Sequence, residues 1–368
     1  MGSHYTTHSY QFDKEWNEAT GVDVFNNNMN LKATQTGLVG EVSHTHKFEK
    51  GKLTSGYRVS NTAISNDLSN LLGHSKFDVN YLEQYFYTEY SGKLDKLNYR
   101  MGIGVTNIHN KGAESTQNDW APTPKLVLNY GLKGNQTLRF TSQYTSYSPS
   151  ASELSPNVVQ IAPNIVKRGN PQLEVKHTFR NLLTYSIGTK YLDMNATAFY
   201  NIVNNYISVF YVSDPITNGY ALLYKNAKDY KEVGGQVSGS IKPFGTNVLS
   251  LGFYLQPVSA RLVAFDGRIF KSQYIRNNFS LTSAFGNWHL TYQFNIPVYT
   301  FDGSFLQMYE NSNHFLASYE LKNWRFSFSY LFMGVPAQYK KKSLEGSIVN
   351  YNNSSQIFSN KNMMTFGI

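Results

Sequence analysis

The stretch YLDMNATAFYNI, residues 191–202, places an apolar side chain at every second position. One side carries Leu192, Met194, Ala196, Ala198, Tyr200 and Ile202, and the other carries Asp193, Asn195, Thr197 and Asn201, with Phe199 as an interruption. Because successive side chains of a β-strand point to opposite faces of a sheet, the stretch predicts a strand with one apolar and one polar face.

The same alternation recurs in NWHLTYQFNIPV (287–298), WRFSFSY (324–330) and NVLSLGFYL (247–255). A soluble β-sandwich alternates in the same way, so the pattern alone leaves open whether the apolar faces meet lipid or one another.

The composition favours a protein made of strands and argues against several other classes of protein. Of the 368 residues, 15% are charged and 15% are aromatic, with 28 Tyr and 24 Phe, which favours strands. No run approaches the ~18–20 apolar residues of a membrane helix. The net charge is +9, but Lys and Arg are scattered, so we expect no nucleic-acid partner. Cysteine is absent, and the opening residues MGSHYTTHSYQF do not resemble an export signal.

The lengths of the connections supply a second, independent clue. Short turn sequences, such as EKGK (49–52), IGTK (187–190), FGNW (285–288) and LKNW (321–324), alternate with long polar stretches. The long stretches are 64–76, 108–122, 148–174, 256–268 and 336–356, and we expect them to be outer loops. This order predicts an all-β fold, a transmembrane antiparallel up-and-down β-barrel with about 15–16 strands in this chain.

In a transmembrane barrel, one face of each strand meets lipid and the other face points into the lumen. We expect the apolar face to meet lipid, with Trp288 and Trp324 in an interfacial aromatic girdle. The expected lipid-facing residues are Leu192, Met194, Leu249, Leu251, Phe253, Trp288, Leu290, Tyr292, Phe294, Trp324, Phe326 and Phe328. The expected lumen-facing residues, which are candidates for ligand contact, are Arg139, Gln143, Arg180, Asp193, Asn195 and Arg325.

Two motifs, YTSYSPSASELSPN (144–157) and RGNPQLEVK (168–176), resemble the barrel region of TonB-dependent outer-membrane receptors, of the Bacteroidota-type outer-membrane β-barrel family. The matching residues are Ser148, Pro149, Ser150, Leu154 and Pro156, followed by Gly169, Asn170, Pro171 and Leu173. Two positions depart from the family pattern, because the acidic residue Glu174 stands one place early and Ser148 replaces an arginine. Since Gly and Pro specify sharp bends, we expect a structural role for these residues.

The resemblance implies an outer-membrane protein that takes part in the uptake of a bulky nutrient, such as a siderophore or glycan. It also implies a barrel of about 22 strands, of which this chain would be the C-terminal part, and a plug domain through which TonB acts. We expect residues 1–368 to form one barrel region without a plug domain or signal peptide. Two alternatives remain: a plugless porin-like passive channel, and a soluble carbohydrate-binding β-sandwich or propeller.

No pattern typical of a catalytic site or a resident cofactor is present, so we expect no enzyme. His44 and His46 stand two residues apart in a strand pattern, but no third metal ligand with suitable spacing accompanies them. The run Lys340–Lys341–Lys342 is typical of a solvated loop, and contact with an anionic glycan or lipopolysaccharide is the alternative.

Overall fold

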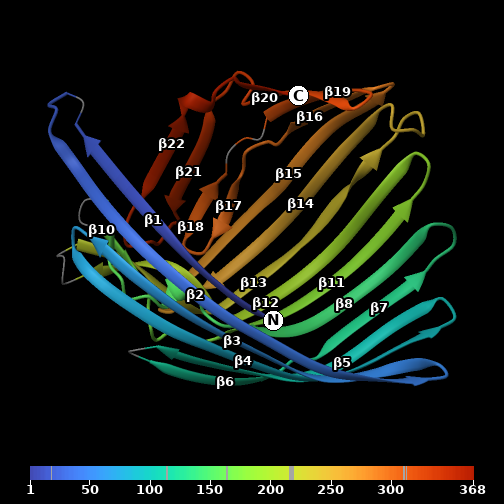
Figure 1. The fold of residues 1–368 in the computed structure, drawn as a ribbon, viewed down its shortest axis with the longest axis horizontal. Helices are drawn as coiled ribbons and strands as arrows, with labels where there is room; N and C mark the ends of the chain where they lie inside the picture. Colours follow the sequence, from blue (N-terminus) through green and yellow to red (C-terminus); the bar gives the residue numbers. More distant parts are fainter. Residues whose placement is uncertain (18, 113–114, 163–164, 215–218, 310, 312) are drawn as a thin grey trace.

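The computed structural model describes residues 1–17, 19–112, 115–162, 165–214, 219–309, 311 and 313–368, and most of them lie in strands. One large sheet contains 19 strands, and a smaller sheet contains four. The helical elements of the described residues are short: α1 (Ala151–Leu154) and a 3-10 turn (Phe358–Asn360). Figure 1 shows the large sheet curving strongly between its first and last strands.

Sixteen strands of the large sheet pair antiparallel in chain order, from β1 at one end to β23 at the other. The first eight are β1 (Gly2–Trp16), β2 (Asp23–Phe48), β3 (Gly51–Asn70), β4 (Gly73–Leu94), β5 (Leu97–Gly112), β7 (Lys125–Gly131), β8 (Gln136–Tyr147) and β11 (Lys176–Gly188). The second eight are β12 (Leu192–Asp214), β13 (Gly219–Ile241), β14 (Ser250–Val263), β15 (Ile269–Phe285), β16 (Trp288–Phe294), β19 (Asn313–Leu321), β20 (Trp324–Leu331) and β23 (Met363–Gly367).

Three short strands branch from this series. Strand β6 (Thr116–Pro122) pairs with β5, and β9 (Val159–Ala162) pairs with β10 (Ile165–Arg168). Strand β10 then pairs parallel with the start of β13. The connections at 49–50, 95–96, 189–191, 286–287 and 322–323 lie at one end of the strands, which we call the turn end; the opposite end is the loop end.

The strand register extends the alternation into rows that cross the sheet. Leu192 pairs with Ile241, Ile241 with Leu251, Leu251 with Leu281, and Leu281 with Tyr292. Directly paired residues share a face, so this row and its apolar neighbours define one face, which we call the outer face. The other expected lipid-facing residues on it are Met194, Phe253, Trp288, Leu290, Phe294, Trp324, Phe326 and Phe328, and Leu249 lies one residue before β14.

The opposite, inner face carries polar rows. Arg139 pairs with Thr184 and Thr184 with Thr197, while Gln143 pairs with Arg180. All six expected lumen-facing residues lie on this face, namely Arg139, Gln143, Arg180, Asp193, Asn195 and Arg325. Their contact with a ligand stays a prediction.

The largest buried cluster also lies on the inner face. Phe199, which interrupts the polar row of β12, is buried there with Phe210, Leu262, Tyr274 and Phe301. Phe199 is therefore a core residue, because a second layer of chain covers this part of the inner face.

That layer is the four-stranded sheet of β17 (Tyr299–Asp302), β18 (Phe305–Met308), β21 (Ala337–Ser343) and β22 (Asn352–Ile357). Phe301 stacks on Tyr230 with a centroid distance of 5.9 Å, and Phe305 packs edge-on against Tyr211 at 5.5 Å. Burial raises the pKa of the Tyr211 hydroxyl above its ordinary value. The small sheet thus packs inside the large one near the loop end.

The expectation that the long polar stretches are loops is wrong in most places. Residues 64–76 form the ends of β3 and β4 around the turn at Leu71–Leu72, and residues 337–343 and 352–356 belong to the small sheet. Strands β2, β3 and β4 contain 26, 20 and 22 residues, about twice the ~9–11 that cross a bilayer. Polar composition did not identify loops here because paired strands that extend beyond the lipid are themselves solvated.

The fold also places the two histidines and the lysine run that the sequence singled out. His44 and His46 lie on the outer face, since Lys47 next to them lies on the inner face with Lys52. Lys341 lies 3.4 Å from the Asp302 carboxylate and over the Phe305 ring, so this run belongs to a paired strand. Within the described ranges, no helix is long and apolar enough to cross a membrane.

Candidate functional site

The two family motifs come together at the loop end, where residues 148–156 and 169–175 form what we call the motif region. The Gly169 amide donates to the Ser155 carbonyl at 2.8 Å, and the Asn170 amide donates to the Glu153 carbonyl at 2.6 Å. The Glu153 carboxylate in turn accepts a hydrogen bond from the Ser150 amide at 2.7 Å. Pro149 is fully buried next to this turn. The motif residues therefore hold one another by main-chain hydrogen bonds and by one hydrogen bond to the Glu153 carboxylate.

Two leucines of the motif region join distant strands of the large sheet, which we also call the wall. Leu154 and Leu173, which are 4% and 0% exposed, pack in one cluster with Phe77 of β4 and Ile207 of β12. The carbonyls of Pro171 and Leu173 accept hydrogen bonds from the Ser115 and Gln117 side chains. The motif region thus crosses the inner face and ties β4, β6 and β12 together.

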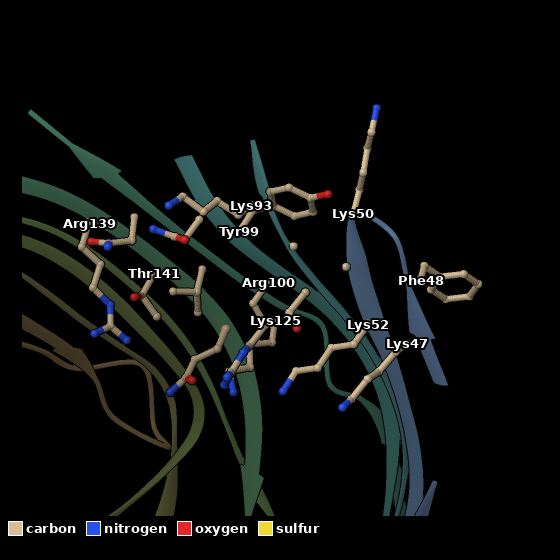
Figure 2. A pocket seen from close by; sticks show the side chains of 17 residues that line it. Lys47, Phe48, Lys50, Lys52, Lys93, Tyr99, Arg100, Lys125, Arg139 and Thr141 are labelled. Atoms are coloured by element: carbon tan, nitrogen blue, oxygen red, sulfur yellow. The ribbon is translucent and has the colours of Figure 1, made fainter. Parts of the chain in front are cut away.

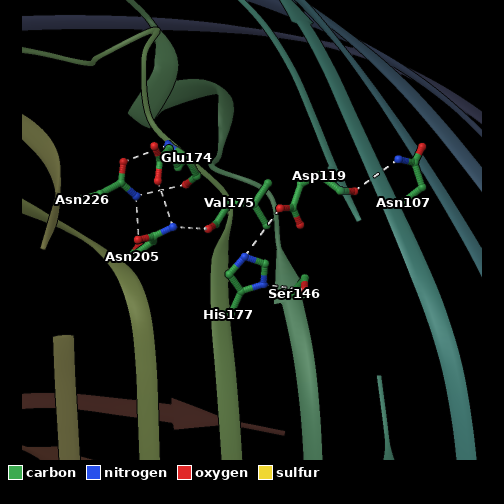
Figure 3. A network of polar contacts seen from close by, with 8 residues as sticks. All are labelled: Asn107, Asp119, Ser146, Glu174, Val175, His177, Asn205 and Asn226. Carbon is green, nitrogen blue, oxygen red and sulfur yellow. Dashed lines mark hydrogen bonds and ion pairs between the residues drawn. The ribbon is translucent and has the colours of Figure 1, made fainter. Parts of the chain in front are cut away.

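Polar contacts fix the far end of the motif region, as Figure 3 shows. The Glu174 amide donates to Asn226 Oδ1 at 2.8 Å, and Asn226 Nδ2 donates to the Glu174 carbonyl at 3.0 Å. Asn205 Nδ2 donates to the Glu174 carboxylate at 2.9 Å, and the main chain of Asn205 has a φ of 53°. Asparagine tolerates this left-handed conformation better than most residues, so Asn205 suits the irregularity in β12.

A second contact in Figure 3 ties β6 to the wall. His177 Nε2 lies 3.7 Å from Asp119 Oδ1, and His177 Nδ1 lies 2.9 Å from Ser146 Oγ. Asp119 stands in β6, Ser146 in β8 and His177 in β11. The three side chains therefore link β6 to β11 and β8.

A cavity of about 300 Å³ lies beside the motif region. The wall contributes Leu31, Leu68 and Tyr224, and the loop between β8 and β11 contributes polar and cationic side chains. These loop residues are Ser152, Ser155, Asn157, Lys167 and Arg168. Lys167 lies over the Tyr224 ring at 5.3 Å, while Arg168 lies 3.6 Å from the Asp214 carboxylate. The cavity can donate hydrogen bonds to a ligand at the loop end and can balance negative charge on it.

A larger cavity of about 870 Å³ lies on the inner face at the turn end of β2 to β8, and we call it the basic cavity. Lys52, Arg100 and Lys125 point toward one region, whereas Lys50 points away from it (Figure 2). The lining residues are Lys47, Phe48, Lys50, Gly51, Lys52, Ser91, Gly92, Lys93, Asn98, Tyr99, Arg100, Lys125, Val127, Asn129, Arg139, Thr141 and Gln143.

Sequence reasoning found only part of these sites. Arg139 and Gln143 line the basic cavity, but Arg180 does not line it. Asp193 forms an ion pair with Lys242 at 2.8 Å, Asn195 accepts a hydrogen bond from Ser186, and Arg325 pairs with Glu320. The lysines of the basic cavity were missed. Lys47, Lys52 and Lys93 shared one signal, a cation on the polar face of a strand next to a short turn, whereas Lys50 lies in a turn and Lys125 begins β7 away from one.

The described residues contain no group of three or more His, Asp or Glu side chains that could hold a metal ion. Both cavities present hydrogen-bond donors and cations on paired strands of the large sheet or on the loop beside them. Such surfaces bind and guide polar ligands.

Comparisons with known proteins agree with this architecture. A model of the outer membrane protein beta-barrel family matches residues 2–367. The copper transporter OprC gives a TM-score of 0.64 at 13% identity, over 90% of this chain and 56% of that one. FpvA of P. aeruginosa, solved with heterologous pyoverdines, gives 0.63 at 11% identity, over 92% and 50%. The siderophore receptor PirA from Acinetobacter baumannii gives 0.58 at 11%, over 90% and 55%.

At such identities these structures establish the fold, and the chain spans about half the length of each. No curated protein matches the chain in sequence. The likeness is to the barrels of TonB-dependent receptors, and it excludes the soluble sandwich or propeller. The protein is located in the outer membrane. With the family match covering nearly every residue, this chain belongs to the outer membrane protein β-barrel family.

Proposed function

We propose that this chain forms the wall of a TonB-dependent receptor that takes up a bulky nutrient across the outer membrane. The observation that carries the proposal is the motif region. It crosses the inner face at the loop end, held by the Gly169 and Asn170 amides and by buried Leu154 and Leu173, and it borders a polar cavity. A wall built only to enclose a lumen has no need for such a cross-connection.

In this proposal the ligand first meets the loop-end cavity. Lys167 and Arg168 provide charge there, Tyr224 provides an aromatic ring, and Ser152 and Asn157 provide hydrogen bonds. A site of about 300 Å³ holds part of a bulky ligand, and other loops would hold the rest. The polar rows of the inner face, including Arg139, Gln143 and Arg180, would then line the way inward.

Energy coupling would require a plug domain, through which TonB acts in the receptor family. The wall itself supplies the lipid contact on its outer face and ligand contacts on its inner face. No catalytic step is part of this proposal.

Uptake in the native host tests the proposal. Cells with the gene intact or deleted receive a ferric siderophore, a copper salt or an oligosaccharide, each with and without a functional TonB system. We expect the uptake of one of these ligands to be lost when the gene is deleted and also when the TonB system is not functional. Uptake that depends on the gene but not on TonB would contradict the proposal.

A second candidate is a passive porin-like channel, which the polar rows of the inner face favour. Barrels of about 16 strands leave an aqueous channel when nothing fills the lumen. Purified protein in planar bilayers distinguishes the two functions, because a channel gives a large, steady conductance without an energy source.

A further inference from the structure

We propose that the basic cavity is a binding site for a ligand that carries several carboxylate or phosphate groups. The inference rests on the proposed function and deepens it, because it names the chemical class of the ligand that passes along the inner face. The argument uses the charges, the strand register and the size of the cavity.

The cavity has a large excess of positive charge. Seven of its lining residues are Lys or Arg, and none is Asp or Glu. Within the described ranges, the carboxylate that forms ion pairs with lining residues is that of Glu89. It lies 3.2 Å from Arg100 and 3.6 Å from Lys125. In the described part of the chain, Lys47, Lys52, Lys93 and Arg139 form no ion pair. One carboxylate therefore faces a cluster of cations that it cannot neutralise.

The strand register makes this arrangement unfavourable without an anion. Lys47 and Lys52 are direct partners across β2 and β3, and Lys52 is in turn opposite Ser91, which is opposite Arg100. Like charges directly opposite each other destabilise a sheet. A bound anion removes that repulsion, so the wall gains stability when the cavity is occupied.

Other cations on the inner face do have partners. Lys242 lies 2.8 Å from the Asp193 carboxylate, and Arg325 pairs with Glu320 across β19 and β20. At these two positions each cation has a carboxylate of its own, which Lys47, Lys52, Lys93 and Arg139 of the basic cavity lack in the described part of the chain.

The chemistry of the lining selects the ligand class. Arginine guanidinium groups match carboxylates and phosphates in a two-pronged geometry, and Arg100 and Arg139 stand on separate strands. Asn98, Asn129 and Gln143 add neutral donors. Because one ion pair near water contributes only about 1 kcal/mol, useful affinity requires several charged groups on one ligand. A cavity of about 870 Å³ has room for such a ligand.

Calorimetry on the purified chain in neutral detergent tests the site, with citrate and inositol hexakisphosphate as probes. The test variant is Lys47→Gln with Lys52→Gln and Arg139→Gln, three cations without an ion pair in the described structure. The matched control is Lys133→Gln with Lys228→Gln and Lys361→Gln, three exposed lysines outside the cavity lining. Both lose three charges, and the shift between heated and unheated samples on gels verifies folding.

We expect the unmodified chain to bind both probes, and the test variant to bind about tenfold more weakly or worse, with the control unchanged. Binding should also weaken as NaCl rises from about 0.05 to 0.5 M. If the triple variant fails to fold, Lys52→Gln alone is expected to weaken binding about threefold.

Absence of binding by both probes, or equal weakening in the control, would overturn the proposal. Binding of poly-aspartate without either small anion would overturn it too, in favour of an acidic protein surface as the occupant. The proposed uptake function is judged separately, since a loss of TonB dependence in cells leaves the calorimetric result unaffected.

Discussion

Gly169 shows how one residue determines the path of the motif region. Its amide donates to the Ser155 carbonyl, and the next amide, of Asn170, donates to the Glu153 carbonyl. A Cβ added at Gly169 would lie closer than any real Cβ contact to both carbonyl oxygens. The glycine is required here for close approach of two main chains, and not for an unusual φ.

We therefore expect Gly169→Ala to separate the two motif segments, with a cost of about 2 kcal/mol or more from the clash and the lost hydrogen bonds. Limited proteolysis should show faster cleavage within residues 148–176. Gly40→Ala is the control, because its added Cβ meets only Val59 Cγ1 at 3.7 Å. Equal protease resistance of the two variants would contradict this role.

Leu173 gives a second prediction at this scale. It is fully buried against Phe77 and Ile207, so Leu173→Ala should destabilise the loop end by about 3 kcal/mol through lost burial and a cavity. Urea titration of the detergent-refolded protein measures the change. Leu71→Ala, at a 61% exposed turn position, should have little effect. If the urea midpoint shifts equally in Leu173→Ala and Leu71→Ala, the burial of Leu173 does not stabilise the loop end.

At the scale of elements, alternation along β15 separates the environments of neighbouring residues. Leu281 stands in the outer row with Leu251 and Tyr292, while Thr282 stands between Ser250 and Thr291 on the inner face. The two residues are adjacent in sequence and lie at nearly the same depth.

We expect Leu281→Lys to cost up to about 2–4 kcal/mol, because the new charge meets lipid, and Thr282→Lys to be tolerated on the polar face. The fraction of protein that gives the folded, heat-sensitive band on gels measures assembly. If both variants assemble equally well, the outer face does not meet lipid in the way we propose.

At the scale of the whole molecule, the large sheet has an apolar outer face and a polar inner face. We propose that coupling to TonB requires a plug. Residues 1–368 expressed alone behind an export signal should therefore reach the outer membrane without TonB-dependent uptake of siderophore, copper or oligosaccharide. Uptake assays in cells with and without TonB test this. A clear TonB-dependent difference would show that the wall alone suffices.

Much of this architecture was predictable from the sequence, because side chains in a strand alternate with a period of two whatever surrounds them. The pattern around Leu192, Leu251, Tyr292 and Phe326 determined the outer face, and each of these residues lies on it. The expected number of strands agrees with the 16 that pair in chain order. The motifs at Pro149, Leu154, Pro156 and Gly169 to Leu173 identified the family.

Only the tertiary structure decided which residues meet across the inner face. Phe199 breaks the polar pattern of its strand because the small sheet, formed by residues 299–308 and 337–357, packs on the inner face and buries it with Phe301. Leu173 meets Phe77, and Lys47 and Lys52 share a cavity with Arg139, although long stretches of chain separate them. Local alternation determines on which face of a strand a residue lies, but the curvature of the sheet and the course of its loops determine which distant residues share a site. Those depend on contacts between remote segments, which no local pattern encodes.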